Sequence, residues 1–268
     1  MSRLFEALKK AELGRSDEEL SSPEAFLDIA DRLRDLSEVS HEIANISLES
    51  RLAVWSSPQS LAADRFRLLR LQLQRLQTAG KLKTLLVTSP GAQDGKSTVI
   101  LNLAVSLAHH KRSVLVLEAD LRCPRLVARL GLKPWSGLSE CVSNGSDPIS
   151  SVRCIDPLGF YLLPAGQAAE SPTELLQSDQ FPALLKNLSP HFDWILIDSP
   201  PTGPIADTMV LRQHADGCLL VVRSGRTPRE TVAEAFAQLG AGFVQGIVLN
   251  ALEGMEAGYR KYYGYADK

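Results

Sequence analysis

The segment Pro90-Gly-Ala-Gln-Asp-Gly-Lys-Ser-Thr98 contains the residue types that hold phosphate groups in a glycine-rich loop. Successive backbone N–H groups and the N-terminus of a following helix can together bind an anion. Lys96 is expected to reach the β- and γ-phosphates, and the Ser97 hydroxyl is expected to ligate Mg²⁺. Because Pro90 stands where the strict G-x-x-x-x-G-K-[ST] pattern has glycine, the loop is a variant. The predicted ATP-binding residues are Gly91, Ala92, Gln93, Asp94, Gly95, Lys96, Ser97 and Thr98.

Acidic residues follow two apolar runs and would complete a magnesium–nucleotide site. Asp198 comes directly after Trp-Ile-Leu-Ile, and Glu118 and Asp120 follow Val-Leu-Val-Leu with Arg122 two residues later. Singly, such an acid is as often the N-cap of the next helix. Together they predict that Asp120 and Asp198, with Ser97, hold the metal. Asp120 or Glu118 could alternatively accept a proton from an attacking hydroxyl, and Arg122 could neutralise phosphate charge.

The C-terminal segment concentrates the aromatic hydroxyls of the chain. Four of the five tyrosines fall within the last ten residues: Tyr259, Tyr262, Tyr263 and Tyr265. One interpretation is an aromatic tail that packs on the domain or on a partner. The other is that the phenols are phosphorylation substrates, because phosphate adds charge and acceptor oxygens beside an arginine and a lysine.

Short apolar runs alternate with helical patterns, which predicts the scaffold that positions these residues. Near-continuous apolar strands indicate a mostly parallel sheet covered on both faces, hence a doubly wound α/β fold of the P-loop NTPase type. Ligands of such sheets bind at the carboxyl ends of the strands. The expected strands are 83–88, 113–117, 160–163, 194–197, 218–222 and 246–249, and the expected helices are 61–76, 97–109, 181–188 and 227–239.

The sequence divides into four predicted parts. Residues 1–13 have helical spacing of apolar residues and form a short amphipathic helix that either docks on its own domain or serves a partner. Residues 14–58 are rich in Ser, Asp and Glu and are expected to be a mobile linker with at most one weak helix near 23–36. The catalytic domain is expected at 59–250, followed by a flexible tail at 251–268.

Composition excludes several classes of protein. A net charge of −2 and a pI near 6.2 show no basic footprint, so no nucleic-acid partner is expected. Cys123, Cys141, Cys154 and Cys218 lie far apart without a C-x-x-C pair, which favours free thiols acting as small core residues. No secretory segment or apolar run of roughly 20 residues is present, so a cytosolic location is expected.

These motifs resemble the bacterial tyrosine kinases (BY-kinases) of capsule and exopolysaccharide synthesis over residues 57–268. The family's Walker A loop, A′ motif D-x-D-x-R, Walker B aspartate and C-terminal tyrosine cluster occur in order, with Glu118 in place of the first A′ aspartate. The family's fold is similar to ParA/MinD ATPases, and Gly91 stands where those ATPases carry a lysine, which favours the kinase branch. The resemblance implies ATP and Mg²⁺ as cofactors and autophosphorylation of the tail tyrosines.

The resemblance also implies assembly. The family's E-x-x-R-x-x-R helix, which pairs subunits in a ring, is matched here by Asp64, Arg67 and Arg70, so a homo-oligomer is expected. The alternative is a solvated charged face of an amphipathic helix.

Partners and location follow from the same resemblance. The opening Met-Ser-Arg-Leu-Phe-Glu-Ala-Leu-Lys-Lys-Ala looks like that of family members encoded apart from their membrane activator. This implies a Wzz-like polysaccharide co-polymerase as activator, a tyrosine phosphatase, and peripheral association with the inner face of the cell membrane. Two competing hypotheses are a ParA/MinD-like ATPase switch without kinase activity and a regulator that binds ATP without turnover.

Overall fold

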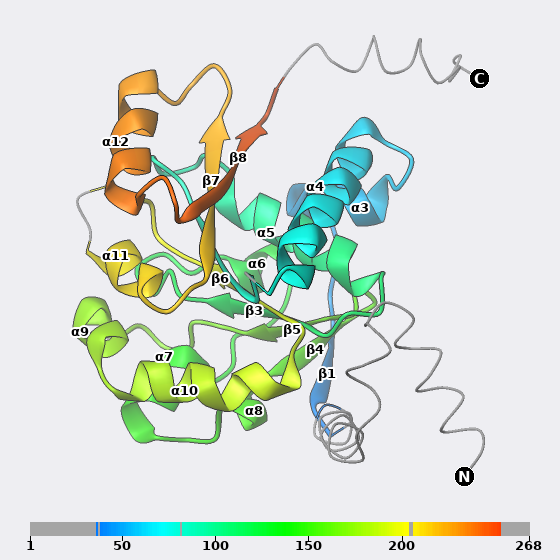
Figure 1. Ribbon diagram of the computed structural model, residues 1–268. Coiled ribbons are helices and arrows are strands. Elements are labelled where there is room, and N and C mark those ends of the chain that lie inside the picture. The colour runs from blue at the N-terminus through cyan, green and yellow to red at the C-terminus, as the bar shows by residue number, and fades with distance from the viewer. Residues whose placement is uncertain (1–35, 37, 81, 204–205, 253–268) are drawn as a thin grey trace. The chain divides into compact units, whose positions relative to one another are not determined.

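The structure is a computed structural model that describes residues 36, 38–80, 82–203 and 206–252 (Figure 1). The chain divides into two compact units, Met1–Val39 and Ser40–Lys268. Every helix and strand considered below belongs to the second unit. The predicted helix at 1–13 and the tyrosines of the tail lie outside the described residues.

One eight-stranded sheet forms the centre of the second unit, in the order β1-β4-β5-β3-β6-β2-β7-β8 (Figure 1). All neighbouring strands are parallel except β4 and β5. The prediction of a mostly parallel sheet is therefore confirmed. The strands are β1 (Ser40–Ile43), β2 (Thr84–Thr88), β3 (Val114–Glu118), β4 (Arg153–Asp156), β5 (Phe160–Leu163), β6 (Trp194–Asp198), β7 (Gly217–Arg223) and β8 (Val244–Asn250).

Helices cover both faces of this sheet (Figure 1). Helix α5 packs on β2, β3, β5 and β6, and α3 and α4 pack against α5. Helices α9 to α12 lie on the other side (Figure 1). The helices are η1 (Leu48–Ser50), α3 (Ala53–Ser56), α4 (Leu61–Thr78), α5 (Lys96–Ala108), α6 (Leu126–Arg129), α7 (Leu138–Asn144), α8 (Pro148–Ser151), α9 (Pro172–Gln177), α10 (Gln180–Leu188), η2 (Ser189–His191), α11 (Asp207–Arg212) and α12 (Arg229–Leu239).

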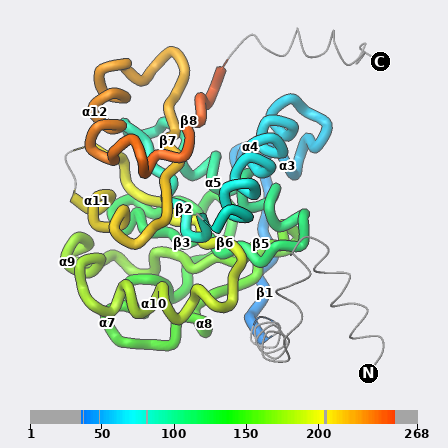
Figure 2. The backbone as a smooth tube through the Cα atoms, viewed as in Figure 1, coloured from blue at the N-terminus to red at the C-terminus, as the bar shows by residue number. Residues whose placement is uncertain are grey.

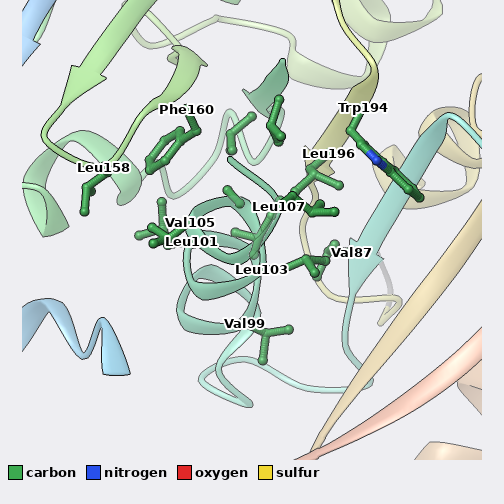
Figure 3. Close-up of a cluster of buried hydrophobic side chains, with 14 of the residues drawn as sticks. Val87, Val99, Leu101, Leu103, Val105, Leu107, Leu158, Phe160, Trp194 and Leu196 are labelled. Carbon is green, nitrogen blue, oxygen red and sulfur yellow. The ribbon is translucent and has the colours of Figure 1, made fainter. Parts of the chain in front are cut away.

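Helix α5 forms the middle of the core because it is apolar on almost every side. Its residues from Val99 to Leu107 are all buried, as expected for a helix enclosed between a sheet and further helices. Figure 3 shows Leu101, Leu103 and Leu107 among side chains from the strands, including Phe160 and Trp194. This packing fixes the N-terminus of α5, where the predicted phosphate-binding loop ends.

The expectation of a mobile linker over 14–58 was wrong for its last part. Residues 40–43 form edge strand β1, and α3 lies beside α4 and α5 (Figure 2). Leu52 and Val54 are buried, and the Asn102 amide accepts from the Val54 N–H at 3.1 Å and donates to the Arg51 carbonyl at 2.9 Å. Elements of three or four residues are too short to show a hydrophobic period, so this docking was not visible in the sequence.

Strand β4 was also missed, because only two apolar residues, Cys154 and Ile155, lie between a charged residue at each of its ends. The prediction that the cysteines are free is consistent with the structure, in which none forms a disulfide. The prediction that all are core residues was wrong for Cys123, which is exposed, whereas the other three are buried.

Candidate functional site

The loop between β2 and α5 is closed by the carboxylate of Asp94. That buried carboxylate accepts from the Gly91 N–H at 2.9 Å and from the Thr227 hydroxyl at 2.9 Å. The first contact holds the loop in a tight turn, and the second joins it to the residues that precede α12. The loop is therefore preorganised by its own side chain and by a distant segment.

Asn250, the last residue of β8, holds the other side of the loop. Its amide donates to the Asp94 carbonyl at 2.9 Å, and a Cβ placed on Gly95 would lie 1.9 Å from the same amide nitrogen. Gly95 also has φ of +102°, a conformation that L side chains rarely adopt. Only glycine fits here, which explains physically why the motif has this residue.

A pocket of about 920 Å³ opens over this loop. Six of its lining residues are cationic, namely Arg51, Lys96, Arg122, Arg125, Arg129 and Arg223, and two, Glu49 and Asp120, are acidic. An excess of cations beside the N-terminus of α5 suits a multiply charged anion. The size and charge of the pocket fit a nucleoside triphosphate.

Asp198 lies at the end of β6 with one oxygen available for a metal or a water. Its Oδ2 accepts from the Ser97 hydroxyl at 3.3 Å, whereas its buried Oδ1 has no hydrogen-bond partner among the described residues. Burial raises the pKa of Asp198 to about 7, against the opposing attraction of Lys96. An unpaired buried carboxylate oxygen next to a hydroxyl is a donor set that fits Mg²⁺.

Asp120 lines the same pocket from the loop after β3. Its Oδ1 accepts from the Cys123 N–H at 3.1 Å. Burial raises the pKa of Asp120, although the nearby Lys96 charge opposes the shift. This carboxylate is therefore a stronger base than an exposed aspartate and faces the space above the loop.

Glu118 is engaged by the backbone. Its Oε1 accepts from the N–H groups of Arg125 and Leu126, both at 2.6 Å, and its Oε2 accepts from the Ala165 N–H at 3.2 Å. It is 1% exposed and does not line the pocket. Burial raises the pKa of Glu118, and these hydrogen bonds oppose the shift. This geometry orders the loop that leads into α6.

Arg122 is held by a residue that the sequence analysis did not identify. Its Nε donates to Asp207 Oδ2 at 2.7 Å, and its Nη2 donates to the Thr173 hydroxyl at 2.9 Å. Thr173 also hydrogen-bonds to Asp207. Burial alone would raise the pKa of Asp207, but the bonds from Arg122 and Thr173 outweigh it and lower this pKa. The guanidinium is thus fixed at the rim of the pocket.

Arg129 is a second residue that sequence reasoning missed. Its Nη1 donates to the Thr98 hydroxyl at 2.7 Å, at the start of α5. Burial, and then the charge of Arg51, lower the pKa of Arg129. The only sequence signal was the density of arginines after Glu118, whose convergence depends on the fold.

The three residues expected at a subunit interface make contacts within the chain. Arg67 pairs with Asp64 and also donates to the Pro58 carbonyl. Arg70 is 8% exposed and donates to the Ser106 carbonyl at 2.9 Å. Asp64 and Arg67 thus face outward from α4, whereas Arg70 joins α4 to α5.

The sequence of this chain is similar to those of known proteins. Residues 90–231 match the family model described as cellulose biosynthesis protein BcsQ. The putative tyrosine-protein kinase CapB of Staphylococcus aureus is 30% identical over 218 residues, covering 80% of this chain and 96% of CapB. The tyrosine-protein kinase wzc of Salmonella typhimurium is 28% identical over 219 residues, which cover 81% of this chain but 30% of wzc.

Solved structures agree with these sequence matches. The kinase domain of the Escherichia coli tyrosine kinase ETK is 26% identical with a TM-score of 0.72, covering 78% of this chain and 82% of that domain. The septum site-determining protein MinD of Pyrococcus horikoshii, complexed with Mg-ADP, is 22% identical with a TM-score of 0.53, covering 62% and 69% of the two chains. The latter similarity concerns the fold alone.

Proposed function

This chain belongs to the bacterial protein-tyrosine kinases, and we propose that it transfers the γ-phosphoryl group of ATP to the tyrosines of its own C-terminal cluster. The observation that carries this proposal is the position of the end of β8. Asn250 and Ala251 line the pocket above the phosphate-binding loop, and the tyrosine-rich segment follows within a few residues. The eight residue-to-residue steps from Ala251 to Tyr259 can span up to about 26–29 Å. The tail therefore starts beside the site that would modify it.

We assign the roles in the site from its geometry. Lys96 and the loop N–H groups from Ala92 to Thr98 bind the phosphates, and Arg129, Arg125 and Arg51 add positive charge around them. Ser97, Asp198 and Asp120 would hold Mg²⁺, which when bound neutralises phosphate charge. Glu118 acts as a positioning residue, because its oxygens hold the loop that carries Asp120 and Arg122.

The transfer itself needs a proton acceptor and charge stabilisation. A tyrosine oxygen attacks the γ-phosphorus, so that a new O–P bond forms while the bond to the β–γ bridging oxygen breaks and ADP leaves. The phenolic proton passes to a carboxylate oxygen of Asp120 that is not bound to Mg²⁺. Arg122, oriented by Asp207, stabilises charge on the transferred group.

Labelling of the tail tests this proposal. The purified chain is incubated with ATP and Mg²⁺, and phosphate is mapped by mass spectrometry. We expect phosphate on Tyr259, Tyr262, Tyr263 or Tyr265, with loss of labelling in Lys96→Met and retention in the exposed control Lys186→Met. ATP consumption with an unmodified tail would instead support a ParA/MinD-like switch.

We further propose an assembly that regulates capsule or exopolysaccharide polymerisation and export. Similarity to the tyrosine-protein kinase wzc supports a membrane activator of the Wzz-like co-polymerase class. In the part of the chain that the structure describes, no helix is long and apolar enough to cross a membrane. The kinase would then act at the inner face of the membrane, and a tyrosine phosphatase would reverse the modification.

Homo-oligomerisation is the remaining part of the proposal. Copies would associate through α4, where Asp64 and Arg67 face outward beside Leu68 and Leu71, which are 49% and 47% exposed. Phosphorylation of the tails between neighbouring subunits would add like charge and weaken the assembly. Addition of the activator's cytosolic segment should increase tail labelling; unchanged labelling at saturating segment would contradict activation by that partner.

A further inference from the structure

Three potential metal ligands converge on the edge of the sheet formed by β1 and β4. His41 is opposite Cys154 and Ile43 is opposite Asp156 in this parallel pair. Because alternate residues of a strand share one face, His41, Cys154 and Asp156 all lie on the same face. One ligand atom from each lies within 4.8 Å of the others. None of the three lines the nucleotide pocket.

We propose that His41, Cys154 and Asp156 form a binding site for a thiophilic divalent cation of the Zn²⁺ class. The cation would connect β1 to β4 through one imidazole nitrogen, one thiolate sulfur and one carboxylate oxygen. This site is independent of the kinase chemistry proposed above.

The geometry fits tetrahedral coordination after a small movement. Bond lengths of about 2.0–2.3 Å place tetrahedral ligand atoms roughly 3.3–3.7 Å apart, which is within the observed spread. His41 Nδ1 and Asp156 Oδ2 are 2.7 Å apart and would separate by about 1 Å. Their side chains are 57% and 45% exposed, so both can move, whereas buried Cys154 fixes one corner. Three protein ligands leave a fourth position for water.

The chemistry of the donors selects the metal. Sulfur and imidazole nitrogen favour Zn²⁺ over Mg²⁺, which prefers oxygen ligands. Without metal, the exposed His41–Asp156 pair would contribute little to stability.

A bound metal would fix the position of the edge strand β1 relative to β4. On the opposite face of the same two strands, Arg153 pairs with Glu42. A metal on the first face would therefore hold β1 from both sides. Strand β1 is one of the two edge strands and follows the unit Met1–Val39 directly in the sequence.

Cobalt provides a spectroscopic test on the full chain. Protein freed of metal with a chelator is titrated with Co²⁺, whose bond to a thiolate gives a charge-transfer band in the near ultraviolet. We expect one equivalent of Co²⁺ to produce this band, Zn²⁺ to remove it, and millimolar Mg²⁺ with ATP to leave it unchanged. Zn²⁺ should also raise the unfolding temperature.

Variants assign the band to the cluster. Cys154→Ser should abolish it, and the changes His41→Ala and Asp156→Asn should weaken Co²⁺ binding because each alters a direct ligand. Cys123→Ser is the matched control, since it removes the exposed thiol elsewhere and should retain the band. Absence of a band in the unmodified chain, or a band that survives Cys154→Ser, would overturn the proposal. Because His41 and Asp156 are exposed, their variants remain informative if Cys154→Ser does not fold.

Discussion

Strands β3 and β6 end side by side in buried carboxylates that have opposite surroundings. Glu118 and Asp198 are paired in register, and they are 1% and 2% exposed. Both oxygens of Glu118 accept backbone N–H groups, whereas Asp198 Oδ1 has no partner among the described residues. Burial and strand position alone therefore do not distinguish a structural carboxylate from the proposed metal ligand, whereas the unsatisfied oxygen of Asp198 favours metal binding.

Of the changes considered, Asp198→Asn should reduce the rate of phosphotransfer most strongly. The change removes the carboxylate proposed for Mg²⁺, and we expect phosphotransfer to fall about 100- to 1,000-fold, as for loss of one preorganised charge-stabilising group. The measurement is the initial rate of tail labelling at saturating ATP. Asp179→Asn, an exposed change elsewhere, should retain the rate. A rate near that of the unmodified chain would exclude Asp198 as a metal ligand.

Replacement of Arg122, in the loop after β3, should have the next largest effect. Arg122→Lys cannot reproduce the two-nitrogen contact with Asp207 and Thr173, and we expect about a tenfold lower rate, equivalent to ~1.4 kcal/mol. Asp207→Asn should have a similar effect, because it releases the same guanidinium. The double variant should be less impaired than the product of the two single effects. Full multiplicativity would show that the residues act independently.

The titration of Asp198 gives the third prediction. Its pKa of about 7 means that the carboxyl is protonated below and ionised above this pH, and Mg²⁺ binds the ionised form. Affinity for Mg-ATP should therefore fall roughly tenfold from pH 8 to pH 6. Calorimetry in buffers of different ionisation enthalpy would detect the released proton. Asp198→Asn should flatten this dependence, and an unchanged slope in that variant would assign the proton elsewhere.

The free energy of unfolding should also depend on the protonation of Asp198. The folded pKa of Asp198 lies above the unfolded value of 3.8, so protonation favours the folded state. Its contribution to the free energy of unfolding is fully present below about pH 4 and is lost as pH rises through about 7. Without metal, Asp198→Asn should therefore be more stable than the unmodified chain at pH 8, as read from urea unfolding.

Glu118→Gln should have the smallest effect on phosphotransfer, which would separate the role of Glu118 from that of Asp198. The amide keeps one acceptor oxygen but turns its NH₂ group toward a backbone donor, so we expect a loss of about 1–3 kcal/mol in the free energy of unfolding. The rate of the folded variant should fall far less than that of Asp198→Asn. A Glu118→Gln protein that is fully stable but inactive would reverse the assignment of the two carboxylates.

The sequence predicted the parts of the molecule that have strong local signals. The P-loop, the strands before Glu118 and Asp198, and helix α5 were visible because apolar runs and glycine-lysine-serine spacing are encoded within short windows. The partners of the site were not. Asp207, Arg129 and Asn250 reach it only through the sheet order, and the contacts of Asn250 span 156 residues of sequence. Glu118 is the opposite case. Its residue type and its position at a strand end suggested a catalytic acid, whereas in the structure its carboxylate accepts backbone N–H groups.

Asn250 also links two processes thermodynamically. It ends β8, its carbonyl accepts from the Ser224 N–H at 2.8 Å, and its amide donates to the Asp94 carbonyl in the phosphate-binding loop. The last residue before the tail is thus part of the pocket proposed to bind the nucleotide. A ligand that displaces Asn250 would break its hydrogen bond to the loop and change the affinity of the loop for nucleotide. By thermodynamic reciprocity, bound nucleotide would change the free energy of displacing Asn250 by the same amount. If the tail is the substrate, as proposed, the amide of Asn250 would couple the position of the tail to nucleotide binding.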